Sequence, residues 1–151
     1  MISPELLRRY PHFAGVDADR LVVLAKAAQE VTTAAGRDFF REGVALPKMY
    51  IVVEGEVAIV TEVPAKNREF VISTVGPGEV FAWSGLVPPY QATSSARAVT
   101  ACRVIAFDCG QLRTRFDEDN ALGYVMMQRL AQVMRDRIQD MHMEALAFLA
   151  D

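Results

Sequence analysis

Short apolar segments follow one another from Val31 onward, and Gly, Pro or charged turns separate them at roughly ten-residue spacing. These segments are rich in Val, Ile, Phe and Tyr, and that spacing is typical of an antiparallel sandwich or roll. The pattern predicts strands at residues 31–34, 38–41, 49–54, 56–63, 69–75, 79–81, 94–99 and 102–108. The polar run at residues 63–68 predicts the tip of a hairpin.

Helical patterning comes before these strands. Ser3 followed by Pro4 is a helix start, with Ser at the cap and Pro at the first helical position, and this helix should end near Tyr10. Asp17 is the cap of a second predicted helix. The apolar residues of that helix share one face at spacings i, i+3, i+4 and i+7: Leu21, Leu24, Ala25 and Ala28.

Helical character returns after Asp108, first at residues 112–116 and then in a long helix that begins near Asp119 or Asn120. The long helix carries a heptad-type apolar stripe, with spacings of four and three, formed by Met127, Ala131, Met134, Ile138, Met141, Ala145 and Phe148. Its charged flanks are Arg129, Arg135, Asp136, Arg137, Asp140 and Glu144.

A helix of about 28 residues is about 42 Å long, which is more than one small roll can cover. We therefore expect part of the stripe to pair with a second copy of the chain as a homodimer. The alternative is that the stripe packs on its own roll, with methionine serving as an adaptable filler.

The stretch from Gly76 to Ala98 holds the candidate binding features. It opens with a Gly-Pro-Gly turn and continues through a short apolar run, two prolines, Tyr90 and the polar run Thr93–Ser95. A one-turn helix between turns and small hydroxyl residues leaves backbone N–H groups facing a concavity, which suits an anion or another small ligand. A plain loop over a sheet is the alternative.

Length and composition indicate one globular domain over residues 1–151, with 52% hydrophobic and 23% charged residues. We divide it into N-terminal helices (1–30), a β-roll (31–108) and C-terminal helices (109–151). The net charge of −3 disfavours a nucleic-acid surface. We also expect a cytoplasmic protein without a membrane partner, because no apolar run approaches about 20 residues and no signal sequence is visible.

Catalytic and metal chemistry are not indicated. His12 and His142 are too few and too scattered for a metal site, and Cys102 and Cys109 lack metal or redox spacing and should be buried thiols. An enzyme of the cupin type would need closely spaced histidines, and the sequence has no His-x-His. We therefore expect neither enzymatic activity nor a cofactor.

Two runs resemble the cyclic nucleotide-binding domain family: AGRDFFREG at residues 35–43 and MYIVVEGEV at residues 49–57. Residues 11–15 and 146–149 are similar to the sensor half of catabolite-activator-type regulators. This resemblance covers nearly the whole chain. It implies a mainly β fold with flanking helices, an antiparallel double-stranded β-helix (a jelly-roll-like β-roll) with N-terminal helices and a long C-terminal dimerisation helix.

In that family a phosphate-binding cassette uses a Glu that accepts from the ribose hydroxyl and an Arg that neutralises the cyclic phosphate. The resemblance places Trp83 at the Glu position, Ala82 where a Gly is usual, and Ala92 at the Arg position beside Thr93. It thus implies a degenerate ligand site formed by Gly78, Ala82, Trp83, Ser84, Gly85, Tyr90, Ala92, Thr93 and Ser94. Each missing charge-assisted hydrogen bond is worth about 1.5–3 kcal/mol, so cyclic nucleotide binding is disfavoured.

Other positions agree with this departure from the family pattern. Arg97 is the nearest cation, but its strand parity is opposite to that of Ala92, so we expect it to point away from the phosphate position. The family's purine-contacting pair falls near Met141 and His142. An indole that fills the vacated pocket is favoured over one that stacks on a ligand.

Three functions remain open. The first is a sensor that passes ligand occupancy to a dimer or to an unknown protein partner through the long helix. The second is a dimerisation or scaffold module whose pocket is filled by Trp83, and the third is a cyclic-nucleotide regulator with a non-standard pocket. A cavity beside Ala92 and Thr93 would separate the first from the second. DNA-binding members of the family carry a further helix-turn-helix domain, and this chain stops at Asp151, so we expect no nucleic-acid partner.

Overall fold

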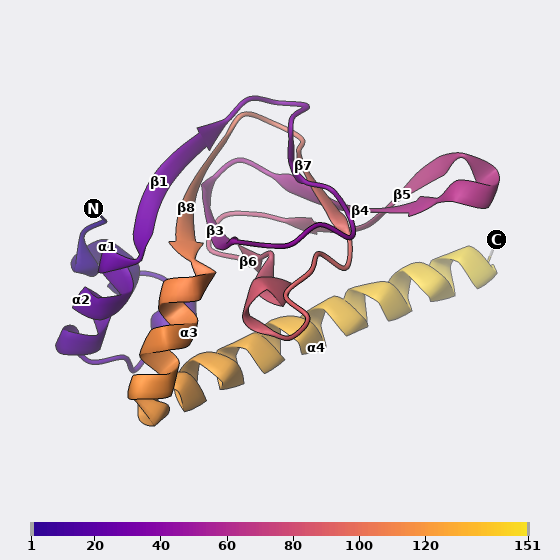
Figure 1. Cartoon of the computed structure of the whole chain (residues 1–151). Helices are drawn as coiled ribbons and strands as arrows, with labels where there is room; N and C mark the ends of the chain where they lie inside the picture. The colour runs from indigo at the N-terminus through magenta and orange to yellow at the C-terminus, as the bar shows by residue number, and fades with distance from the viewer. Residues whose placement is uncertain (1, 151) are drawn as a thin grey trace.

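The computed structural model describes residues 2–150, and within them two four-stranded antiparallel sheets form a roll (Figure 1). The strands are β1 (Ala28–Thr33), β2 (Asp38–Phe40), β3 (Lys48–Glu54), β4 (Val57–Val63), β5 (Arg68–Val75), β6 (Val80–Phe81), β7 (Ser95–Ala98) and β8 (Cys102–Asp108). One sheet has the order β1-β8-β3-β6 and the other has the order β2-β7-β4-β5. The predicted mainly β roll is confirmed.

Helices precede and follow the roll, and two short 3-10 helices lie between its strands. They are α1 (Pro4–Arg8), η1 (Pro11–Phe13), α2 (Ala18–Lys26), η2 (Pro64–Lys66), η3 (Trp83–Leu86), α3 (Cys109–Glu118) and α4 (Asn120–Ala150). Two predicted caps are confirmed, since Asp17 accepts from Arg20 N and Asp119 accepts from Leu122 N, whereas Ser3 precedes α1 without a side-chain capping hydrogen bond. None of the described helices is both long enough and apolar enough to cross a bilayer.

The predicted strands agree with the structure to within one residue at each end, except for the first. Ala28 was expected on the apolar face of the second helix, and this expectation is wrong. The helix ends at Lys26, and Ala28 instead pairs with Phe107 in the first position of β1. The cause is a tertiary hydrogen bond, because Asp108 N donates to Ala27 O and draws the chain into the sheet. The start of the roll therefore moves from residue 31 to residue 28.

The sheet formed by β1, β8, β3 and β6 is buried on both faces. Successive side chains of a strand point to opposite faces, so Ile51 and Ile105 pack against the N-terminal helices, α3 and α4. Their neighbours Val52 and Val104 face the interior of the roll, and all four side chains are fully buried. This sheet therefore contributes side chains to two hydrophobic cores and fixes the helices relative to the roll.

The helix α4 begins in the core and leaves it. Its 31 residues are about 46 Å long, and Figure 1 shows it passing beneath the roll and running on beside the β4–β5 hairpin. Leu122, Met126 and Leu130 in its first half are buried. Large apolar residues in its second half, such as Phe148 and Leu149, are 77% and 79% exposed in this single chain.

Both cysteines are buried free thiols, as predicted. Cys109 lies under η3, and burial raises the pKa of its thiol to about 12. It therefore stays protonated and acts as a small apolar side chain.

We predict that Gly55→Ala destabilises the roll much more than Gly43→Ala. Both glycines have a left-handed backbone, with φ of +102° and +88°, so each replacement costs about 1–2 kcal/mol in backbone strain. An added Cβ at Gly55 would also lie 2.6 Å from Ala101 O and 2.8 Å from Cys102 Sγ, whereas Gly43 faces open space. Urea denaturation should show a further loss of about 1–3 kcal/mol for Gly55→Ala. Equal losses for the two variants would contradict this packing argument.

Candidate ligand-binding site

A cavity of about 390 Å³ lies between the β2-β7-β4-β5 sheet, η3 and α4. Its volume is within the range of roughly 300–1,000 Å³ that is typical of small-molecule sites. Phe40, Ile59, Ile72 and Phe81 form apolar walls on the side of the roll. The Phe81 ring is held by stacking on Tyr50 at a centroid distance of 4.9 Å.

Six of the nine predicted site residues line this one cavity: Ala82, Trp83, Ser84, Ala92, Thr93 and Ser94. The other three lie outside it. Gly78 borders a second, smaller cavity of about 220 Å³. Gly85 packs behind η3, and the Tyr90 ring lies beneath the Arg113 guanidinium, 4.2 Å from the guanidinium carbon to the ring centroid.

The first part of the cassette, residues 82–85, is held in place by its backbone conformation and by contacts with α3. Ala82 has a left-handed backbone with φ of +63°, which gives a physical reason for the Gly usual at this position. A Cβ at Gly85 would lie 2.6 Å from Cys109 Sγ and 2.9 Å from Leu46 O, so only glycine lets η3 approach this closely. Arg113 Nη1 on α3 donates to Gly85 O at 2.6 Å. The short helix is thereby fixed to α3.

The second part of the cassette, residues 92–95, is held in place mainly by backbone hydrogen bonds. Ala92 N donates to Val44 O at 2.8 Å, and Gly43 N donates to Ala92 O at 2.9 Å. Ser95 Oγ accepts from Glu42 N, so its hydroxyl is used structurally. Within the described residues, the hydroxyls of Ser84 and Thr93 take part in no side-chain hydrogen bond and can interact with a ligand or with water.

The expectation that the Trp83 indole fills the vacated pocket is wrong. Trp83 is half-buried, packs against the core cluster on the helix side and forms part of the cavity wall. The left-handed Ala82 and the start of η3 set this direction. The cavity beside Ala92 and Thr93 stays open as a result.

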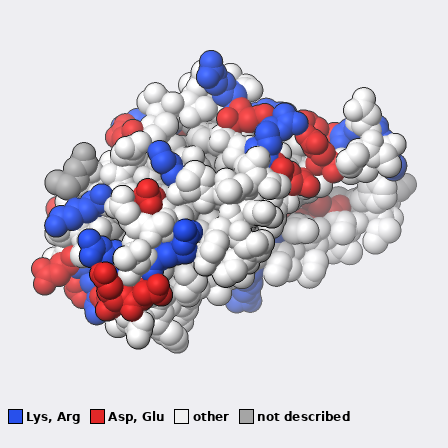
Figure 2. Space-filling model, in the orientation of Figure 1, with Lys and Arg blue, Asp and Glu red and all other residues white. Residues whose placement is uncertain are grey.

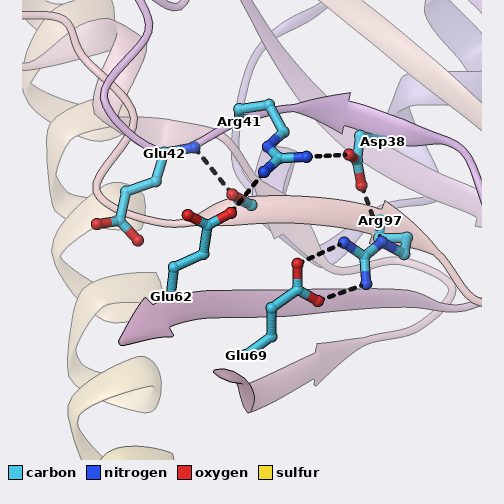
Figure 3. A network of polar contacts seen from close by, with 7 residues as sticks. Asp38, Arg41, Glu42, Glu62, Glu69 and Arg97 are labelled. Carbon is cyan, nitrogen blue, oxygen red and sulfur yellow. Dashed lines mark hydrogen bonds and ion pairs between the residues drawn. The ribbon is translucent and has the colours of Figure 1, made fainter. Parts of the chain in front are cut away.

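Arg97 points away from the cavity, as its strand parity predicts. Its Nε donates to Asp38 at 2.9 Å, and its two Nη atoms donate to Glu69 at 2.8 and 3.1 Å (Figure 3). Hydrogen bonds from Arg97 lower the pKa of the Glu69 carboxyl. On the face shown in Figure 2, acidic and basic side chains are interspersed.

The charged residue of the cavity wall was missed by the sequence reasoning, which placed Arg137 on a charged flank. Among the described residues that line the cavity, Arg137 carries the single formal charge. It lies on α4 with three residues of the predicted dimer stripe that also line the cavity, namely Met134, Ile138 and Met141. These four positions have the spacing i, i+3, i+4, i+7 of one helix face, which is the signal that could have revealed the site.

The remaining predicted residues of the stripe have different surroundings. Met127 packs against the core on the helix side. Ala131, Ala145 and Phe148 are exposed in the single chain. Their role in a dimer stays a prediction.

No three His, Cys, Asp or Glu side chains within residues 2–150 converge as a metal site would require. His12 is buried at the second cavity, and this burial, together with the nearby positive charge of Arg129, lowers its pKa to about 4. His142 is exposed on α4.

The model of the cyclic nucleotide-binding domain family matches residues 30–119, which contain the whole cassette. The chain belongs to this family. It is also 29% identical, over 131 residues, to a CRP-like cAMP-activated global transcriptional regulator of Mycobacterium tuberculosis. That match covers 87% of this chain but only 58% of the relative's length.

Solved structures of similar proteins have the same fold. A protein from Geobacter metallireducens assigned as cyclic nucleotide-binding is 32% identical with a TM-score of 0.82, and the match covers 91% of this chain and 99% of that one. The N-terminal domain of a transcriptional regulator from Streptomyces coelicolor is 29% identical with a TM-score of 0.70, covering 90% and 94%.

Proposed function

We propose that this chain is a non-enzymatic sensor module that binds a small ligand other than cAMP or cGMP and acts as a homodimer. The observation that carries this proposal is that α4 both lines the cavity and exposes apolar residues to solvent. One face of the helix closes the cavity through Met134, Ile138 and Met141, and its second half presents apolar residues to solvent. Ligand contact and assembly therefore involve the same rigid element.

The chemistry of the cavity supports a ligand other than a cyclic nucleotide. The positions that the family pattern gives to the ribose acceptor and the phosphate cation hold Trp83 and Ala92. Arg97 cannot replace the lost cation, because Asp38 and Glu69 already engage it. Most of the remaining cavity wall is apolar.

The exposed half of α4 supports pairing with a second copy. Phe148 and Leu149 are more than three-quarters exposed, and Leu146 is 61% exposed on the same stretch. Monomeric proteins rarely leave a large contiguous apolar surface in water. A scaffold with a filled pocket is less well supported, because the cavity is open.

We expect cAMP and cGMP to bind weakly or not at all. Loss of two charge partners costs about 3–6 kcal/mol, which corresponds to a weakening of roughly a hundredfold to ten-thousandfold. Isothermal titration calorimetry with each nucleotide measures this directly. Submicromolar affinity for either nucleotide would overturn the proposal and favour a true cyclic-nucleotide regulator.

We predict that the double variant Trp83→Glu, Ala92→Arg gains measurable cyclic-nucleotide affinity. It restores both charge partners on a cassette whose backbone is already held by Val44, Gly43 and Arg113. Each single variant should gain less, because one partner remains absent. A folded double variant that shows no binding at millimolar nucleotide would mean that the cassette backbone is remodelled.

We predict that Ile138→Asp and Phe148→Asp each shift the dimer to monomer, because each places a charge in the apolar seam. Phe148 is not among the residues that line the cavity, so its variant separates assembly from ligand binding. Gln139→Asp, at an exposed polar position on the same helix, is the control and should stay dimeric. Sedimentation analysis at micromolar concentration measures the mass, and a wild-type monomer under these conditions would refute the dimer.

A further inference from the structure

Arg137 is the one charged residue among the described residues that line the cavity, and it is set within the apolar α4 face of Met134, Ile138 and Met141. Its side chain is partly buried, and burial lowers the pKa of its guanidinium. Removing a cation from water is costly unless an anion or several hydrogen bonds compensate. The surroundings of this guanidinium therefore decide what it can bind.

Protein groups within residues 2–150 satisfy Arg137 only in part. Its Nη1 donates to Ser73 Oγ at 2.7 Å, and that is its single side-chain hydrogen bond there. The carboxylates that face it are Asp136 and Asp140 from its own helix and Glu79 just before β6, and none is within ion-pair distance. All three border the second cavity, which Arg137 also lines, so Arg137 lies between the two cavities.

Two of these carboxylates accept hydrogen bonds from neutral groups, and Asp140 shares the Ser73 hydroxyl with Arg137. Glu79 Oε1 accepts from Gly76 N at 3.0 Å, and Asp140 Oδ2 accepts from Ser73 Oγ at 2.8 Å. A guanidinium has five N–H donors in a planar fork, so Arg137 keeps donors for a further acceptor. A carboxylate matches that fork in shape and in charge.

The rest of the cavity limits the other end of the ligand. Aromatic and aliphatic side chains, among them Phe40, Ile72 and Phe81, form the wall across from α4. Ser84 and Thr93 on the cassette add only neutral hydroxyls. One cation and an apolar chamber suit a monoanion with an apolar body better than a multiply charged phosphate.

We propose that the cavity binds an apolar organic acid, with Arg137 pairing with its carboxylate and the apolar side chains of the roll enclosing its hydrocarbon part. This inference rests on the proposed function, since it names the ligand class of the same cavity. It moves the cationic partner from the cassette to α4. Ligand charge then acts directly on the helix that is proposed to form the dimer.

The test uses matched pairs of probes that differ only in charge: octanoate and octanamide, phenylacetate and phenylacetamide, cyclohexanecarboxylate and cyclohexanecarboxamide. Trp83 is the single tryptophan in the sequence and lines the cavity, so its fluorescence reports occupancy. Titrations of the wild-type chain are compared with Arg137→Gln. The control is Arg135→Gln, an exposed arginine on the same helix that does not line the cavity.

We expect at least one acid to bind about tenfold to a hundredfold more tightly than its amide. Arg137→Gln should remove this preference and leave amide binding unchanged, whereas Arg135→Gln should behave as the wild type. Equal binding of acids and amides, or equal behaviour of the two variants, would overturn this inference and leave the proposed sensor function intact. Failure of every acid and amide to bind at millimolar concentration would overturn both.

Discussion

The burial of the β1-β8-β3-β6 sheet on both faces is the constraint on which the rest of the structure depends. Residues of β3 and β8 alternate between the core of the helices and the interior of the roll. The β8 strand continues directly into α3, which holds η3 through Arg113 and the close contact of Gly85 with Cys109. The position of the cassette is therefore fixed from the sheet outward.

Much of the fold could be predicted because its signals are local. Apolar alternation located the strands, and capping by Asp17 and Asp119 depends on residues only three positions away. The end of α2 could not be predicted in the same way. Alanine favours helix, and the hydrogen bond that places Ala28 in a strand comes from Asp108, which is distant in the sequence.

The candidate site was predicted only in part, for the same reason. Six cassette residues lie close together in the sequence and line one cavity. The Tyr90 ring instead packs against the guanidinium of Arg113 on α3, which is more than 20 residues away in the sequence. The direction of Trp83 depends on the left-handed backbone of Ala82, which a sequence pattern does not reveal. Arg137 was missed because the α4 pattern was interpreted for a dimer surface alone, whereas four residues of this helix line the cavity.

The proposed use of α4 for both ligand contact and dimerisation would give the sensor a short coupling path. The family pattern implied by the resemblance places the cation on the cassette. Here η3 is held by Gly85 and Arg113, and the charged residue of the cavity wall, Arg137, lies on α4 itself. A ligand can shift an equilibrium only through a difference in its interaction with the two states. In the proposed sensor these differential contacts come from α4, which Ser73 of β5 links to the roll by hydrogen bonds with both Arg137 and Asp140.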